Sequence, residues 1–173
     1  MGETQRQIGI IVHALLARAA QGAAPPGQPF DADGAGVLEQ LRLHGVPRAE
    51  RQSAAALIVS AVTRTLNDER GRWILGSHRE AANELALTGL AAGRLQSVVI
   101  DRCFVDESGT RWVIDYKTSR HQGADLAGFL EQEMQRYRAQ LHSYAALAQA
   151  LGPEPVRAGL YFPLLGTFRE LSL

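Results

Sequence analysis

Three charged side chains in one short stretch of the chain could do chemistry together: Asp101, Asp115 and Lys117. Two carboxylates held side by side repel each other unless they share a proton or bind a cation. A divalent metal ion that prefers oxygen ligands is the natural occupant of such a pair. A lysine beside that ion can reach a group that reacts there. The residue types therefore predict a metal-and-lysine site, provided that the fold brings the three side chains together.

A β-hairpin would bring them together. Residues 98–106 and 110–117 are rich in β-branched and apolar side chains, as strands are. Glu107-Ser108-Gly109 lies between them and is predicted to be a three-residue loop with glycine in the left-handed conformation. If Asp106 pairs with Thr110, the two aspartates face each other, with Cβ atoms roughly 4.5–5.5 Å apart. The lysine then lies on the same face at the same end of the hairpin.

The lysine is unusual for this chain. Lys117 is the only lysine, beside 17 arginines. Arginine spreads its charge over a planar fork, whereas lysine is a compact point charge whose pKa is readily shifted. Because the chain uses arginine at every other cationic position apart from histidine, we interpret Lys117 as a residue present for its chemistry.

The alternative interpretation is a set of solvated charges on an exposed hairpin, since an isolated D-x-K is common. Apolar neighbours on both faces instead favour a buried, central hairpin, where unpaired charges are costly. These neighbours are Val99, Cys103, Val105 and Val113 on one face and Ile100, Phe104, Trp112 and Ile114 on the other.

Length and composition limit the classes of protein to consider. The chain has 173 residues, 46% hydrophobic and 21% charged, which suits a single globular domain. Its net charge is zero, so any binding of nucleic acid must use local patches. The one cysteine, Cys103, excludes disulfides within the chain and cysteine-rich zinc sites. We expect no transmembrane helix and no secretory signal, and the cytoplasm as the default location.

The first helix is predicted over residues 4–20 from the spacing of its apolar side chains. His13 lies at the edge of that apolar stripe, one turn after Gly9. Two interpretations stay open for this histidine. It is either a half-buried side chain at a helix edge or an imidazole ligand for the metal of the hairpin.

Further helices are predicted after a loop over residues 21–33. Asp33 would cap a short helix that ends at Gly45. Pro47 would open a longer helix over residues 48–66. Its arginines are either solvated or in contact with a phosphate backbone; they are Arg48, Arg51 and Arg64.

A strand over residues 84–91 would precede the hairpin and make a three-stranded meander. Residues 72–75 form a short apolar segment, and the secondary structure of residues 77–82 is ambiguous. Glu84 is either a third carboxylate near the metal or a charge at the end of a strand.

A long helix is predicted over residues 125–151, followed by a strand over 156–162 and a last strand over 167–171. The crossover helix favours parallel pairing of the 156–162 strand. Gln140 and Tyr144 share a face of that helix, one turn apart. Either Tyr144 is core and Gln140 surface, or both face the active site or DNA.

Several motifs follow one another along the chain: G-x-x-x-H in the first helix (Gly9, His13), Glu84 in NELALTG, IDR at 100–102, IDYKTS at 114–119, Q-x-x-x-Y (Gln140, Tyr144) and LYFPLLG at 160–166. Together with the order of helices and strands, they resemble the PD-(D/E)XK nucleases. The resemblance is closer to the RecB-like nuclease domain at the C-terminus of UvrD-type helicases and exonucleases, and it spans nearly the whole chain.

The resemblance implies an α/β, restriction-endonuclease-like fold: a central mixed β-sheet flanked by helices, with residues 1–75 mainly helical and 76–173 forming the catalytic core of a single domain. It also implies hydrolysis of DNA with one or two Mg²⁺ or Mn²⁺ ions. Asp101 and Asp115 would be metal ligands, and His13 and Glu84 would complete the set. Lys117 would position the attacking water and offset charge.

Gln140 and Tyr144 would support the site or the DNA. The implied partners are single- or double-stranded DNA and a UvrD-type helicase motor in the same or a partner chain, in repair or recombination near the nucleoid. No membrane partner is expected.

Two features depart from the family pattern. A motor needs the G-K-[S/T] of a phosphate loop, and the only lysine here follows Tyr116. The family also often has glycine where this chain has Val99. Two rival hypotheses remain. One is a catalytically silent module that binds DNA or docks a partner, and the other is a structural domain whose hairpin charges pair with arginines such as Arg102.

Overall fold

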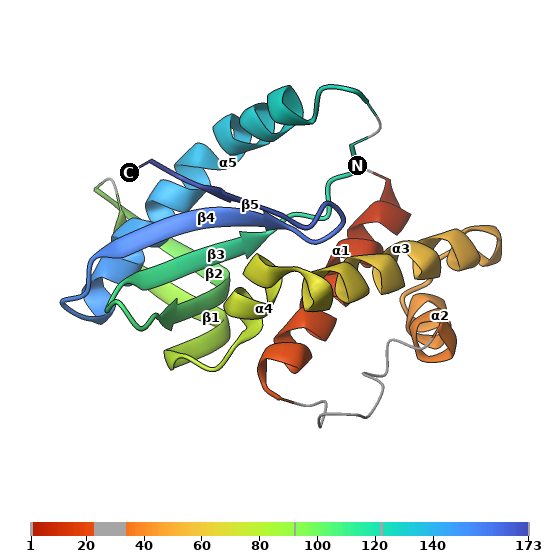
Figure 1. Cartoon of the computed structure of the whole chain (residues 1–173), viewed down its shortest axis with the longest axis horizontal. Helices are drawn as coiled ribbons and strands as arrows, with labels where there is room; N and C mark the ends of the chain where they lie inside the picture. The colour runs from red at the N-terminus through yellow and green to blue at the C-terminus, as the bar shows by residue number, and fades with distance from the viewer. Residues whose placement is uncertain (1, 23–33, 92, 122, 173) are drawn as a thin grey trace. The chain divides into compact units, whose positions relative to one another are not determined.

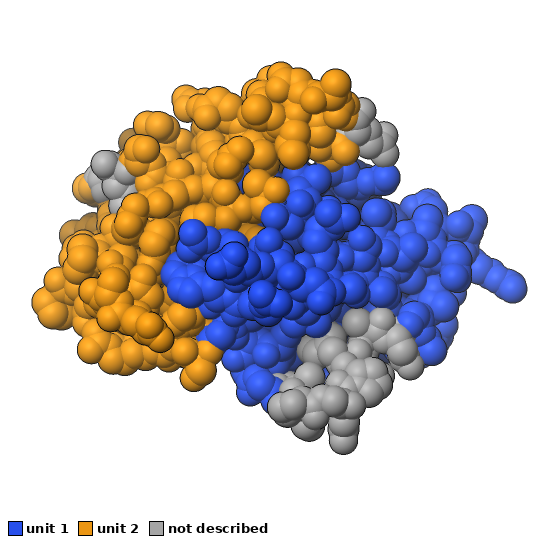
Figure 2. All heavy atoms as spheres, in the orientation of Figure 1, with its two compact units in different colours: residues 1–76, 117–120, 162–166 blue, residues 77–116, 121–161, 167–173 orange. Residues whose placement is uncertain are grey.

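The computed structural model of the chain describes residues 2–22, 34–91, 93–121 and 123–172. The chain divides into two compact units, which Figure 2 shows in blue and orange. The first comprises Met1–Gly76 with the short segments Lys117–Arg120 and Phe162–Gly166, and the second comprises Ser77–Tyr116, His121–Tyr161 and Thr167–Leu173. The predicted loop over 23–33 and the Asp33 cap lie outside the described residues.

The first unit is helical: α1 (Glu3–Ala20), α2 (Gly34–Leu43), α3 (Arg48–Asn67) and α4 (Glu69–Leu75). The predicted apolar stripe of α1 is buried, from Ile8 to Leu16. Gly45 has φ +74°, as expected of a glycine that follows a helix. None of the helices in the described segments is long and apolar enough to cross a membrane.

The helix α4 differs from the sequence prediction, which had only a short apolar step at 72–75. Asp68 ends α3 and begins α4, because its carboxylate accepts a hydrogen bond from the Gly71 backbone N–H at 2.7 Å. A side-chain acceptor at this position satisfies a donor of the new first turn. Ile74 and Leu75 are buried, so the apolar residues that suggested an extended step are the inner face of this helix.

The second unit carries the sheet: β1 (Arg79–Ala91), β2 (Arg94–Val105), β3 (Arg111–Tyr116), β4 (Val156–Phe162) and β5 (Thr167–Glu170), hydrogen-bonded in that order. Pairing is antiparallel from β1 to β3 and parallel between β3 and β4 (Figure 1). The predicted fold class, an α/β fold with a mixed sheet made of a meander and a strand that follows a crossover helix, is confirmed.

The hairpin has the predicted register. Val105 pairs with Arg111 and Arg102 with Ile114, while the Asp106 N–H donates to the Thr110 carbonyl at 2.9 Å. Gly109 has φ +81°, where an L side chain is disfavoured. Asp106 also organises the turn, because its carboxylate accepts hydrogen bonds from Ser108, Thr110 and Trp112; the donors are Ser108 N and Oγ, Thr110 N and Trp112 Nε1.

The first two strands are longer than predicted. β1 begins at Arg79, within the stretch that was ambiguous, and β2 begins at Arg94 rather than near residue 98. The β2 residues before Arg102 extend past the ladder with β3, so Val99 is 53% exposed. The expectation of a hairpin buried on both faces is therefore wrong for the start of β2 and right for β3, where every residue is buried.

The crossover helix α5 spans Leu126–Ala148 and ends in a short 3₁₀ turn at Gln149–Leu151. It begins at a capping residue, Asp125, which accepts a hydrogen bond from the Gly128 N–H at 2.8 Å. α5 packs against β1 and β3. Its buried residues include Leu141 and Tyr144, so the helix presents the predicted Tyr144 face to the second unit's core.

Candidate active site

Asp115 is the next-to-last residue of β3 and is 3% exposed. Gln140 of α5 donates a hydrogen bond from Nε2 to Asp115 Oδ1 at 3.0 Å. An amide donor stabilises a buried carboxylate but does not neutralise it. The end of β3 therefore holds a buried acid that is oriented from the neighbouring helix.

Asp101 lies next to the end of the ladder between β2 and β3. Arg102 pairs with Ile114 as the last pair of that ladder, and Asp101 and Asp115 are the neighbouring residues on the two strands. Asp101 Oδ2 accepts a hydrogen bond from the Tyr116 backbone N–H at 2.7 Å, which ties this carboxylate to the strand that carries Asp115. This contact agrees with the predicted register, and the direct pairing of the two carboxylates stays a prediction.

Tyr144 is linked to Asp115 through Gln140, which forms a hydrogen bond with each of them. Gln140 Nε2 lies 2.6 Å from Tyr144 Oη, one helical turn away. Burial raises the pKa of Tyr144, the hydrogen bond with Gln140 lowers it, and the negative charges of Asp115 and Asp101 raise it further. Both carboxylates therefore lie near the phenol. Tyr144 is 8% exposed, as the interpretation that places it in the core expected, whereas Gln140 contacts Asp115, as the other interpretation expected. A role of the pair at an active site stays a prediction.

Glu84 of β1 lies across from Asp101. The pairs on either side of it are Asn83 with Arg102 and Leu85 with Ile100. Glu84 is exposed and has φ +49°, a left-handed backbone that costs a residue other than glycine about 1–3 kcal/mol. This conformation breaks the regular alternation of side chains along β1, so the register alone does not fix the direction of the Glu84 carboxylate.

Lys117 follows β3 directly and is half-buried. The next residue, Thr118, is held against α1 in the first unit, because Gln5 Nε2 donates to the Thr118 carbonyl oxygen at 3.0 Å. A Cβ atom on Gly9 would lie 3.3 Å from Thr118 Oγ1. The absence of a side chain at Gly9 therefore lets this segment approach α1 closely.

His13 shares a face of α1 with Gln5 and Gly9, because the three follow one another at intervals of one turn. It is half-buried, and both interpretations of this histidine stay open. The G-x-x-x-H motif thus has a physical basis in α1: the glycine admits the segment that follows Lys117, and the histidine stands one turn further along. Ligation by His13 stays a prediction.

The carboxylates suit a hard metal ion by the chemistry of their donors. Each of the two hydrogen bonds described above engages one oxygen, and a carboxylate offers about four lone-pair sites. Two carboxylates facing each other are a donor set for Mg²⁺ or Mn²⁺. Among the described residues, however, no group of three or more His, Cys, Asp or Glu side chains is placed to hold an ion. The four-ligand set of His13, Glu84, Asp101 and Asp115 therefore stays a prediction.

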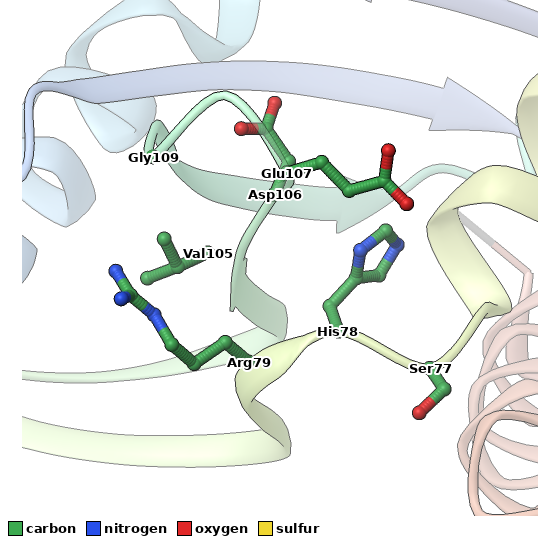
Figure 3. A pocket seen from close by; sticks show the side chains of 7 residues that line it. All are labelled: Ser77, His78, Arg79, Val105, Asp106, Glu107 and Gly109. Atoms are coloured by element: carbon green, nitrogen blue, oxygen red, sulfur yellow. The ribbon is translucent and has the colours of Figure 1, made fainter.

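The other end of the hairpin holds a cavity of about 460 Å³. Figure 3 shows the His78 ring turned toward the Glu107 carboxylate, with Arg79 pointing away from it. The ring of His78 also stacks on Phe104, with centroids 4.1 Å apart. Because this cavity lies at the β2–β3 turn and the two aspartates lie at the opposite end of the hairpin, it is not the candidate active site. Its lining is Ser77, His78, Arg79, Val105, Asp106, Glu107 and Gly109.

The sequence analysis missed one contribution at the candidate site and another at the opposite end of the hairpin. The backbone N–H of Tyr116 holds Asp101, and a backbone donor has no sequence signal. Arg111 is 2% exposed and forms ion pairs with Glu80 at 2.6 Å and Glu154 at 3.0 Å. The arginine could have been suspected, since it is a charged residue at the start of a mainly apolar strand. Its pairs join the start of β1 to the turn before β4.

Comparisons with known proteins bear on this arrangement. The family model of the PD-(D/E)XK nuclease superfamily matches residues 2–169 of the chain. A solved structure, protein VC1899 from Vibrio cholerae, aligns at 13% identity with a TM-score of 0.32, over 94% of this chain and 48% of that one. The chain thus spans about half the length of that protein. No curated protein was found to match.

Proposed function

The chain belongs to the PD-(D/E)XK nuclease superfamily, and we propose that it hydrolyses the phosphodiester bonds of DNA with Mg²⁺ or Mn²⁺. One observation carries the proposal. Asp101 and Asp115 adjoin the last pair of the ladder between β2 and β3, and each is held by a hydrogen bond, from the Tyr116 N–H and from Gln140. Neighbouring carboxylates repel each other, and a bound cation would offset that repulsion.

Each residue of the candidate site has a proposed role. Asp101 and Asp115 bind the metal ion, with His13 and Glu84 as the candidates to complete its ligands. When bound, the ion polarises the phosphate and lowers the pKa of a nearby water. Lys117 orients that water and offsets the negative charge that develops on the phosphate, a preorganised electrostatic effect.

Gln140 and Tyr144 act through Asp115. The amide of Gln140 fixes the orientation of the carboxylate, and Tyr144 fixes the amide, so the pair are positioning residues. Partners of this kind commonly change metal affinity or activity by about 10–100-fold when removed.

We also propose the finer context that the motifs suggest. IDYKTS, IDR and Q-x-x-x-Y resemble RecB-like nuclease domains, so we propose an exonuclease-like activity beside a UvrD-type helicase motor, in DNA repair or recombination. The motor would lie outside these 173 residues, since their only lysine is not preceded by glycine. Co-purification of a tagged chain with an ATP-hydrolysing helicase tests this context separately from the chemistry.

The activity is tested on end-labelled single- and double-stranded DNA with Mg²⁺, with Mn²⁺ and with EDTA. We expect cleavage that needs the metal ion and is lost in Asp115→Asn. The matched control is Asp125→Asn, since Asp125 is an exposed helix cap that an asparagine can replace. Wild-type protein that binds DNA but cuts neither substrate with either ion would contradict the proposal and favour a silent DNA-binding module.

A further inference from the structure

A cavity of about 370 Å³ in the first unit lies between α2 and the first turn of α3. One face of α2 forms one wall, with residues at intervals of three and four. Arg48 and Arg51 stand one turn apart at the start of α3 and form the other wall with Gln52. The α2 wall consists of Ala35, Leu38, Glu39 and Arg42.

The charges around this cavity do not balance. Glu39 accepts two hydrogen bonds from Arg42, at 2.8 Å from Nε and 2.7 Å from Nη2. This hydrogen bonding lowers the pKa of Glu39, and the charge of Arg51 lowers it too, so Arg51 lies near the same carboxylate. The lining holds one carboxylate and three guanidinium groups, so it carries an excess of two positive charges.

The arginines are placed to present donors to the cavity. Arg51 donates from Nε to the Val46 carbonyl oxygen at 2.7 Å, which anchors the side chain while the two terminal nitrogens of its fork keep further donors. Arg48 and Arg42 are exposed. A planar guanidinium fork matches the geometry of a phosphate group. The cavity thus has the chemistry of a phosphate site at the surface of the unit.

We propose that this arginine cavity binds a backbone phosphate of the DNA, as an anchoring point separate from the residues that cut. The inference rests on the proposed function for the identity of the ligand. A chain with zero net charge has no overall field to hold a polyanion, so a local excess of arginine must do so. An exposed cavity suits a phosphate that is part of a passing strand.

The test uses two substitutions that are expected to change DNA affinity in opposite directions. Arg48→Ala removes one phosphate contact, so it weakens DNA binding by roughly three- to tenfold and lowers the slope of log K against log salt by about 0.9. Glu39→Gln removes the competing carboxylate and tightens binding. Arg94→Ala is the matched control, because it removes an equal charge from an exposed position on β2.

Binding is measured in the full chain by fluorescence anisotropy of labelled single- and double-stranded DNA, with EDTA present so that no cutting occurs. Weaker binding by Arg48→Ala than by Arg94→Ala, with tighter binding by Glu39→Gln, supports the site. Equal affinities for Arg48→Ala and Arg94→Ala, or weaker binding by Glu39→Gln, overturn it. Cleavage by the wild type is scored separately, so either proposal can fail while the other stands.

Discussion

Asp101 accepts a hydrogen bond through Oδ2 from the backbone N–H of Tyr116, over 2.7 Å. Tyr116 is the residue after Asp115, so the first acid is bonded to the strand that carries the second. The backbone of β3 therefore holds the Asp101 carboxylate, whereas Gln140 of α5 orients that of Asp115. Because Gln140 bonds to a side chain and takes no part in the pairing of the strands, its substitution should change activity without unfolding the sheet.

Replacing Gln140 tests whether activity can be changed without unfolding the sheet. Gln140→Ala removes the hydrogen bond to Asp115 Oδ1, and we expect DNA cleavage to fall by about 10–100-fold at limiting Mn²⁺. Raising the Mn²⁺ concentration should recover part of the rate, because the carboxylate is still present. Gln132→Ala is the control, an exposed position on the same helix. A rate equal to that of the control at every Mn²⁺ concentration would show that the amide does not position Asp115.

Replacing Lys117 tests the chemical role of the only lysine. Lys117→Ala should lower the rate of cleavage by about 10²–10³-fold, the usual cost of losing one preorganised charge stabiliser. Lys117→Arg should not restore the rate, because the broader fork places its charge differently. Circular dichroism should show an unchanged fold. Wild-type cleavage by purified Lys117→Ala would sink the assigned role.

The hairpin shows how far the sequence leads. The register that juxtaposes Asp101 and Asp115 followed from one loop, because a three-residue connection with glycine last fixes every later pair. That Gln140 and Tyr144 share a face of one helix followed from their spacing, whereas their proposed role came from the resemblance. Such inferences succeed where a local rule determines the geometry.

Other features depend on tertiary contacts, which leave no local pattern. Arg111 is buried because Glu80 and Glu154, from distant parts of the chain, pair with it. Val99 was expected to be buried, yet it is exposed because β2 extends beyond its ladder with β3. The left-handed backbone at Glu84 could not be predicted from the sequence, because glutamate normally avoids that conformation.

Gly9 offers a test of the contact between α1 and the segment after Lys117. Gly9→Ala gains helix propensity of about 1 kcal/mol but places a Cβ atom 3.3 Å from Thr118 Oγ1. We expect a free energy of unfolding close to that of the wild type and a lower rate of cleavage, because Thr118 and with it Lys117 must shift. Gly34→Ala is the control, with no heavy atom within 4 Å of the new Cβ. Equal cleavage rates for the two variants would contradict this positioning role.

The burial of Cys103 should make the free energy of unfolding depend on pH in the alkaline range. The thiol is 1% exposed, and burial raises its pKa, against the opposing effect of Arg111. In the unfolded chain the thiol ionises near pH 8.5, so above that pH the folded state holds more protons than the unfolded state. The free energy of unfolding should therefore fall as pH rises above about 8.5. Urea unfolding should show a smaller fall for Cys103→Ala, and equal pH dependence would refute this origin.

The central claim is that Asp101 and Asp115 together hold a divalent metal ion. The most direct test is to titrate the protein with Mn²⁺ and to record the electron paramagnetic resonance signal of the Mn²⁺ that stays free. We predict saturable binding by the wild type and by Asp125→Asn. The double variant Asp101→Asn, Asp115→Asn, folded by circular dichroism, should leave the added Mn²⁺ free. Equal binding by the double variant, or no binding by the wild type, would contradict the claim.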